Sequence, residues 1–195
     1  REWAAGGRVW PQVQTRPIDI SWTLDQRSIM FLALPGWWPV LSLPTKEEKL
    51  AAFADPDKRA ALAGTINMLA SVPNAGLDPS GFVIREVALE SNRDLVGRTL
   101  GEIASDRNVT PGDLLIDLSV EEDLGTWFMR ADIGHSDADA VGGLLAHPYV
   151  HVGASDGGAH VGSFATYGDT GFLISRYVRE TGALRLEEAV KKITL

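Results

Sequence analysis

The stretch YVHVGASDGGAH, residues 149–160, decides how the fold of this sequence is interpreted. It begins as a short apolar run and ends in a polar turn with two glycines, a pattern typical of a buried strand followed by a loop. One helical pattern precedes it, from Ser136 to the residue before Pro148, and another follows, from Phe172 to Glu180. Strands that alternate with helices predict an α/β fold with parallel strands.

Two further segments have the composition of strands, and several positions carry the capping residues that start helices. The additional strands are residues 8–17 and 82–89, and the additional helices begin near Thr45, Asp57, Thr99, Thr110 and Leu186. The stretch from Phe31 to Pro44 contains two tryptophans and three prolines, which favours an irregular apolar loop. About three convincing strands are too few to close a barrel.

Composition sets limits on the class of protein. The chain has 195 residues, with 18 Lys and Arg against 26 Asp and Glu, which gives a net charge of −8. This acidic balance argues against nucleic acid or an anionic membrane as the main partner. The absence of Cys excludes disulfides, thiolate metal sites and cysteine nucleophiles. No stretch approaches the roughly 18 apolar residues of a membrane span, so we expect a soluble, cytoplasmic protein.

The turn after the strand at 149–156 holds the candidate functional residues. Asp156 and His160 stand at the strand exit, and the intervening glycines allow close approach of a ligand. A carboxylate there can bind a metal ion and take a proton from bound water, and an imidazole can bind metal or substrate. The simpler interpretation is that Ser155 and Asp156 only form a tight turn, because Asp and Gly are common in such turns.

A second chemistry fits the same residues. Residues 153–157 read Gly-Ala-Ser-Asp-Gly, which matches the nucleophile elbow of serine hydrolases, with Ser155 as the nucleophile. The triad acid and histidine follow the serine in that family, and the single later histidine, His160, is very close in sequence. We therefore rank the serine mechanism as the weaker alternative.

Two other features favour structural roles. The adjacent Trp37 and Trp38 are expected to pack in the core, because aromatic pairs bury large areas. An acidic run along one predicted helix and its exit is expected to be a solvated face rather than a metal site. This run comprises Asp113, Asp117, Glu121, Glu122 and Asp123.

Several segments together resemble the N-acyl-D-amino-acid deacylase (D-aminoacylase) branch of the amidohydrolase superfamily. The segments that carry the resemblance are residues 9–12, 34–37, 95–104, 152–162, 172–180 and 184–194. The resemblance implies a (β/α)8 TIM barrel that uses zinc to hydrolyse the amide bond of N-acyl-D-amino acids or related small-molecule amides. In that family an Asp after the eighth strand binds the metal or its water, and it acts first as general base and then as general acid. Asp156 matches this residue.

The resemblance also implies further roles and limits. His160 and Ser155 are expected to contact the substrate or to support the metal site. The His-x-His motif and the middle-strand ligands of the family are absent. Residues 1–195 are therefore expected to be the C-terminal portion of a barrel domain, truncated at both ends. Because catalytic zinc needs about three protein ligands, we expect the chain alone to bind zinc weakly and to be inactive.

A partial barrel leaves strand edges unpaired, and unpaired edges favour self-association. We therefore expect a homo-oligomer that forms through the open edges. The alternative function is a non-catalytic structural or binding module that retains the barrel fold without its metal site.

Overall fold

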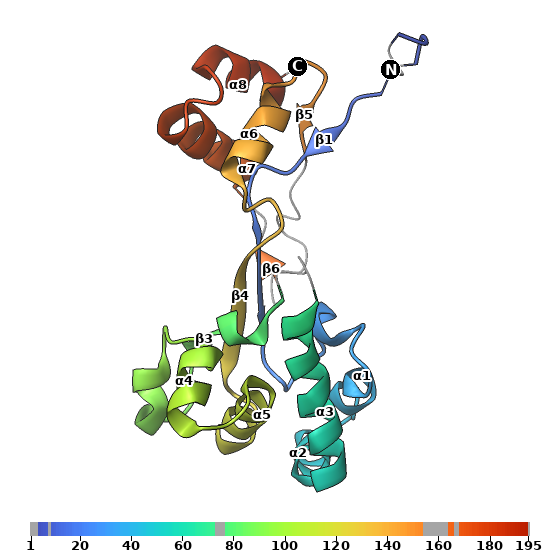
Figure 1. Cartoon of the computed structure of the whole chain (residues 1–195), viewed down its shortest axis with the longest axis vertical. Helices are drawn as coiled ribbons and strands as arrows, with labels where there is room; N and C mark the ends of the chain where they lie inside the picture. Colours follow the sequence, from blue (N-terminus) through green and yellow to red (C-terminus); the bar gives the residue numbers. More distant parts are fainter. Residues whose placement is uncertain (1–3, 8, 73–76, 154–163, 166–167, 195) are drawn as a thin grey trace. The chain divides into compact units, whose positions relative to one another are not determined.

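The structure is a computed structural model that describes residues 4–7, 9–72, 77–153, 164–165 and 168–194. It is a mixed α/β protein (Figure 1). The strands are β1 (Gln12–Val13), β2 (Ile18–Trp22), β3 (Val83–Glu86), β4 (Trp127–Ile133), β5 (His151–Val152) and β6 (Phe164–Ala165). The α-helices are α1 (Trp37–Leu41), α2 (Lys46–Ala54), α3 (Pro56–Met68), α4 (Leu100–Arg107), α5 (Pro111–Glu121), α6 (Ala138–Ala146), α7 (Asp169–Phe172) and α8 (Leu186–Thr194). A π-helical segment, Leu173–Glu180, continues α7.

The chain divides into two compact units. Unit 1 combines the N-terminal residues up to Asp19 with the residues from Asp132 onward, and unit 2 is Ile20–Ala131. The second unit is therefore inserted into the sequence of the first. Strands β2 and β4 each contain one of the two boundaries, so they form the covalent connections between the units.

Unit 2 has an aromatic core. The Trp22 ring packs edge-on against Phe82 at 5.0 Å and against Phe31 at 6.0 Å, and it stacks on Phe128 at 6.1 Å. Phe31 in turn stacks on Trp37 at 4.6 Å. All five rings are at most 2% exposed. Aromatic side chains bury about 150–250 Å² each, so this cluster accounts for much of the stability of the unit.

The predicted helix starts of unit 2 are confirmed. Thr45 and Thr99 each accept a bond from the backbone N–H of the glutamate three residues later, and that glutamate returns a bond to the threonine N–H. Thr110 caps α5, which has Pro111 at its first position. Each such cap satisfies donors that a helix end otherwise leaves unpaired.

The region between Phe31 and Pro44 contains a helix, so the prediction of an irregular loop there was wrong. Helix α1 starts after Gly36, which has a positive φ of 82°, and Pro39 falls in the first turn, where no intrahelical N–H is needed. Trp37 is fully buried and donates its indole N–H to the Leu62 carbonyl and the Thr65 hydroxyl. The expectation of core packing is confirmed for Trp37, whose burial fixes the short helix, and it was wrong for Trp38, which is 37% exposed.

The expectation of parallel strands holds in one sheet and fails in the other. The larger sheet has the order β3-β4-β2-β6, and β3 pairs with β4 in antiparallel orientation. Glu86, at the end of β3, pairs with Trp127, at the start of β4. Helices α4 and α5, between these strands, thus bring the chain back to the same end of the sheet at which β3 finished. A parallel crossover would instead carry the chain to the opposite end before the next strand begins. The pattern analysis identified neither β2 nor β4.

Unit 1 contains the smaller, parallel sheet of β1 and β5 (Figure 1). Its helices pack around one apolar cluster, which comprises Val141, Leu145, Leu173, Tyr177, Leu184 and Ala189, all at most 4% exposed. Within the residues that the structure describes, neither sheet closes into a barrel. In the same residues no helix combines the length and the apolar character that crossing a membrane requires.

Glu122 is buried, so the prediction that the whole acidic run is a solvated face was wrong for this residue. Its side chain accepts bonds from the backbone N–H groups of Ala88 and Leu89 and, at 2.7 Å, from the Asn92 side chain. It is 2% exposed. A buried carboxylate that accepts several bonds from one loop fixes the conformation of that loop, here residues 88–92.

We predict that Glu122→Gln lowers the free energy of unfolding by about 1–3 kcal/mol, because the new amide donors face backbone donors in a buried site. The matched change at its exposed neighbour, Glu121→Gln, is expected to stay within about 0.5 kcal/mol of the parent. Urea denaturation followed by circular dichroism measures both. Equal effects of the two changes would contradict a structural role for the Glu122 carboxylate.

Two glycines give a second matched pair. A Cβ on Gly112 would lie 2.4 Å from the Ala63 carbonyl oxygen, because α3 and α5 approach closely there, whereas a Cβ on Gly64 meets nothing within 4 Å. We predict that Gly112→Ala destabilises the protein by about 1–3 kcal/mol. Gly64→Ala is expected to stabilise α3 by about 0.5–1 kcal/mol. Thermal unfolding distinguishes them, and a neutral Gly112→Ala would show that the helices can separate without cost.

Candidate functional site

The three site residues predicted from the sequence, Ser155, Asp156 and His160, lie outside the described residues. The structure describes the strand that leads to them and the helix that follows them. Both belong to unit 1. The geometry of the site is therefore built from the residues on either side.

Strand β5 enters the candidate site beside β1. The His151 N–H donates to the Pro11 carbonyl at 2.9 Å, and the Gly153 N–H donates to the Val13 carbonyl at 2.8 Å. The pairing is parallel, with Gln12 opposite His151. The carboxyl ends of the two strands consequently lie at the same edge, which is where parallel α/β proteins place their functional loops.

A buried hydrogen-bonded pair stands just beyond the carboxyl end of β1. The carboxylate oxygen Oδ1 of Asp169 accepts the Thr15 N–H at 3.1 Å. The Thr15 hydroxyl lies 3.0 Å from the same oxygen and 2.9 Å from the Asp169 carbonyl, so its single proton is shared between two acceptors. Thr15 and Asp169 are 0% and 5% exposed. These bonds join residues that are 154 positions apart in the sequence.

Tyr177 adds a third member to this pair. Its hydroxyl donates to the Thr15 carbonyl at 3.0 Å, and the ring belongs to the apolar cluster of unit 1. Burial raises the pKa of Tyr177 above its usual value, and the nearby Arg176 guanidinium partly opposes this shift. The phenol therefore stays protonated, as its role as a donor requires.

Two buried polar atoms near this pair lack a hydrogen-bond partner in the described part of the chain. They are Oδ2 of Asp169 and Nε2 of Gln14, the residue before Thr15. Buried polar atoms are nearly always paired in native proteins, with ordered water as a frequent partner. The end of β1 thus offers one acceptor and one donor beyond the bonds already made.

The segment that carries the candidate residues is attached to the end of β1 on both sides. It begins after Gly153, which is bonded to Val13, and it ends at Asp169, which is bonded to Thr15. Residues 13–15 are therefore bonded to Gly153, before the stretch that contains Ser155, Asp156 and His160, and to Asp169, which follows that stretch after β6. Pattern analysis missed Thr15 and Asp169, because no local spacing links residues so far apart.

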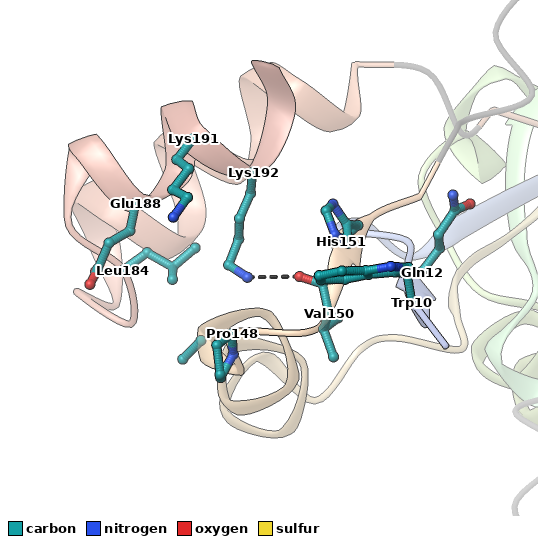
Figure 2. Close-up of a pocket in the computed structure, with 10 residues that line it drawn as sticks. Trp10, Gln12, Pro148, Val150, His151, Leu184, Glu188, Lys191 and Lys192 are labelled. Atoms are coloured by element: carbon teal, nitrogen blue, oxygen red, sulfur yellow. Dashed lines mark hydrogen bonds between the residues drawn. The ribbon is translucent and has the colours of Figure 1, made fainter. Parts of the chain in front are cut away.

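A separate cavity of about 720 Å³ lies near the amino-terminal ends of β1 and β5 (Figure 2). It is formed between helix α8, the end of α6 and the two strands. Its lining residues are Trp10, Gln12, Ala146, Pro148, Val150, His151, Leu184, Glu188, Lys191 and Lys192. The volume falls within the roughly 300–1,000 Å³ range of small-molecule pockets. No spacing in the sequence had indicated this cavity.

The described residues do not fit a zinc site. Among them, no three His, Asp or Glu side chains come close enough together to hold a metal ion. His147 is exposed at the end of α6, where its Nδ1 accepts the Tyr149 N–H at 3.3 Å. His151 packs its ring against Trp10 at 4.9 Å. These two histidines have structural partners of their own.

Comparison with known proteins gives a partial match. No protein-family model matches the chain, and no solved structure matches it. The chain is similar to an uncharacterized protein of Mycobacterium bovis and to uncharacterized proteins from two strains of Mycobacterium tuberculosis. Each is 28% identical over 108 residues, which cover 53% of this chain and 18% of the relative. The chain thus matches less than a fifth of the length of these relatives.

We predict that Thr15→Val and Asp169→Ala are energetically coupled. Thr15→Val leaves Oδ1 of Asp169 with the Thr15 N–H alone, and Asp169→Ala leaves the buried Thr15 N–H without its acceptor, each at a cost of about 1–3 kcal/mol. A double-mutant cycle measured by urea denaturation is expected to give a coupling energy of about 1 kcal/mol. The exposed Thr170→Val, paired with Asp169→Ala, serves as the control and should give additive effects. Additivity in both cycles would contradict the bonded pair.

Proposed function

We propose that this chain is part of a metal-dependent amidohydrolase of the D-aminoacylase kind. It would form the last strands and helices of a (β/α)8 barrel, and its substrates would be N-acyl-D-amino acids or related amides. Three observations support the proposal. Residues 152–162 and 172–194 resemble the family, β1 and β5 pair in parallel, and helices α7 and α8 follow β5 in the chain.

One observation carries the proposal furthest. Gly153, which precedes Asp156, and Asp169, which follows it after β6, are both bonded to residues 13–15, at the carboxyl edge of a parallel strand pair. Active sites of parallel α/β enzymes form at this edge, because several loops meet there while the strands keep them rigid.

The chemistry assigned to Asp156 is acid–base catalysis of amide hydrolysis. Its carboxylate removes a proton from a water molecule as the water oxygen attacks the amide carbonyl carbon. The protonated carboxyl then gives that proton to the amine nitrogen, and the C–N bond breaks. His160 and Ser155 contact the substrate or support the metal site. The zinc that the resemblance implies would polarise the carbonyl and acidify the water, and its ligands are not among the described residues.

The test compares Asp156→Asn with the exposed control Asp139→Asn. Because the relatives are much longer than the matched segment and this chain alone is expected to be inactive, both substitutions are made in the complete product of its gene, with N-acetyl-D-leucine as substrate and the L-enantiomer as control. Loss of a general base costs about 10²–10⁴ in kcat. We predict a decrease of that size for Asp156→Asn and none for Asp139→Asn.

Three outcomes would redirect the proposal. Full activity of Asp156→Asn would exclude the assigned role of this carboxylate. Loss of activity in Ser155→Ala, together with activity that survives a chelator, would instead favour the serine nucleophile. A complete gene product that hydrolyses neither enantiomer and binds no zinc would support the non-catalytic module.

A further inference from the structure

The cavity between α8 and the strands β1 and β5 has a local excess of positive charge. Lys191 and Lys192 line it, and the Lys192 ammonium extends from α8 to the Val150 carbonyl, immediately before β5 (Figure 2). The one acidic lining residue, Glu188, is already engaged, because its carboxylate accepts the Arg185 N–H at 3.0 Å and lies 3.3 Å from the Arg185 guanidinium. Within the described residues, no ion pair involves Lys191 or Lys192. This positive site occurs in a chain whose net charge is −8.

Lys192 is held in place by the backbone. Its ammonium donates to the His147 carbonyl at 2.9 Å and to the Val150 carbonyl at 2.7 Å. An ammonium has three N–H donors, so one remains after these two bonds. Burial lowers the pKa of Lys192, with Glu188 opposing the shift and Lys191 adding to it. An anion in the cavity would offset both the burial and the repulsion between the lysines.

The remaining walls are apolar and aromatic. Trp10 meets the His151 ring edge-on at 4.9 Å and the Tyr149 ring at 6.0 Å, and these contacts orient an indole that is still 49% exposed. Pro148, Val150 and Leu184 line the same cavity. An oriented aromatic wall beside two ammonium groups suits a ligand with a flat apolar body and an anionic end.

We propose that this cavity is a binding site for a small carboxylate attached to an aromatic or similarly flat apolar group. The carboxylate is placed between Lys191 and the remaining donor of Lys192. The apolar body packs against Trp10 and Pro148. The site lies near the amino-terminal ends of β1 and β5 and uses none of the residues assigned to amide hydrolysis, so it is a second site with its own specificity.

Isothermal titration calorimetry of this chain with benzoate tests the proposal, with benzamide as the neutral probe of the same shape. We expect benzoate to bind and benzamide to bind at least about tenfold more weakly, since only the anion gains from both lysines. Lys191→Gln is expected to weaken benzoate binding about fivefold, because it removes one charge and keeps the aliphatic stem. Lys191→Arg should retain the affinity.

The controls separate this site from general charge effects. Lys58→Gln, in α3 of unit 2, removes one positive charge from an exposed position and should leave benzoate binding unchanged. Trp10→Leu should weaken benzoate and benzamide alike, because it removes the aromatic wall. Absence of benzoate binding, equal affinity for the two probes, or equal effects of Lys191→Gln and Lys58→Gln would overturn the proposal.

Discussion

The parallel pairing of β1 with β5 is the interaction on which unit 1 depends. Only two residues on each strand take part, and they are about 140 positions apart in the sequence. Such a short ladder is weak by itself, so other contacts must hold it. Those contacts are the buried bonds of Thr15 with Asp169 and Tyr177, and the apolar cluster around Tyr177. Strand pairing, buried polar bonds and helix packing therefore support one another in a single cooperative unit.

The same pairing separates two chemical environments. Near the carboxyl ends, residues 13–15 bond to Gly153 and to Asp169, and buried donors and acceptors predominate. Near the amino-terminal ends, a cavity is lined by lysines and an exposed tryptophan. A carboxylate that moves protons is suited to the first environment, and recognition of an anion is suited to the second. Because the strands are only two residues long, modest changes in their register would affect both ends.

Unit 2 is organised by different forces. Five stacked or edge-packed rings fill its core, and the fixed loop at residues 88–92 depends on the buried Glu122 carboxylate. The sequence of this unit interrupts that of unit 1 between Asp19 and Ile20 and resumes it after Ala131. Along the sequence, unit 2 therefore stands between β1 and the later elements α6 and β5. Strand β1 packs against both of these elements. The two sequence segments that form unit 1 must therefore find each other although all of unit 2 separates them along the chain.

Local chemistry in the sequence was sufficient to predict the helix starts at Thr45, Thr99 and Thr110, because a cap and its partner lie three residues apart. It also predicted the strands at β1, β3 and β5. The strand-exit pattern singled out Asp156, and the family resemblance strengthened that choice. Tertiary structure decided the helix at Trp37, the antiparallel pairing of β3 with β4, the burial of Glu122 and the bond between Thr15 and Asp169. Each of these depends on a partner distant in the sequence, or on loss of contact with water. A sequence pattern reveals neither the distant partner of a residue nor its burial, since both are determined only when the chain is folded.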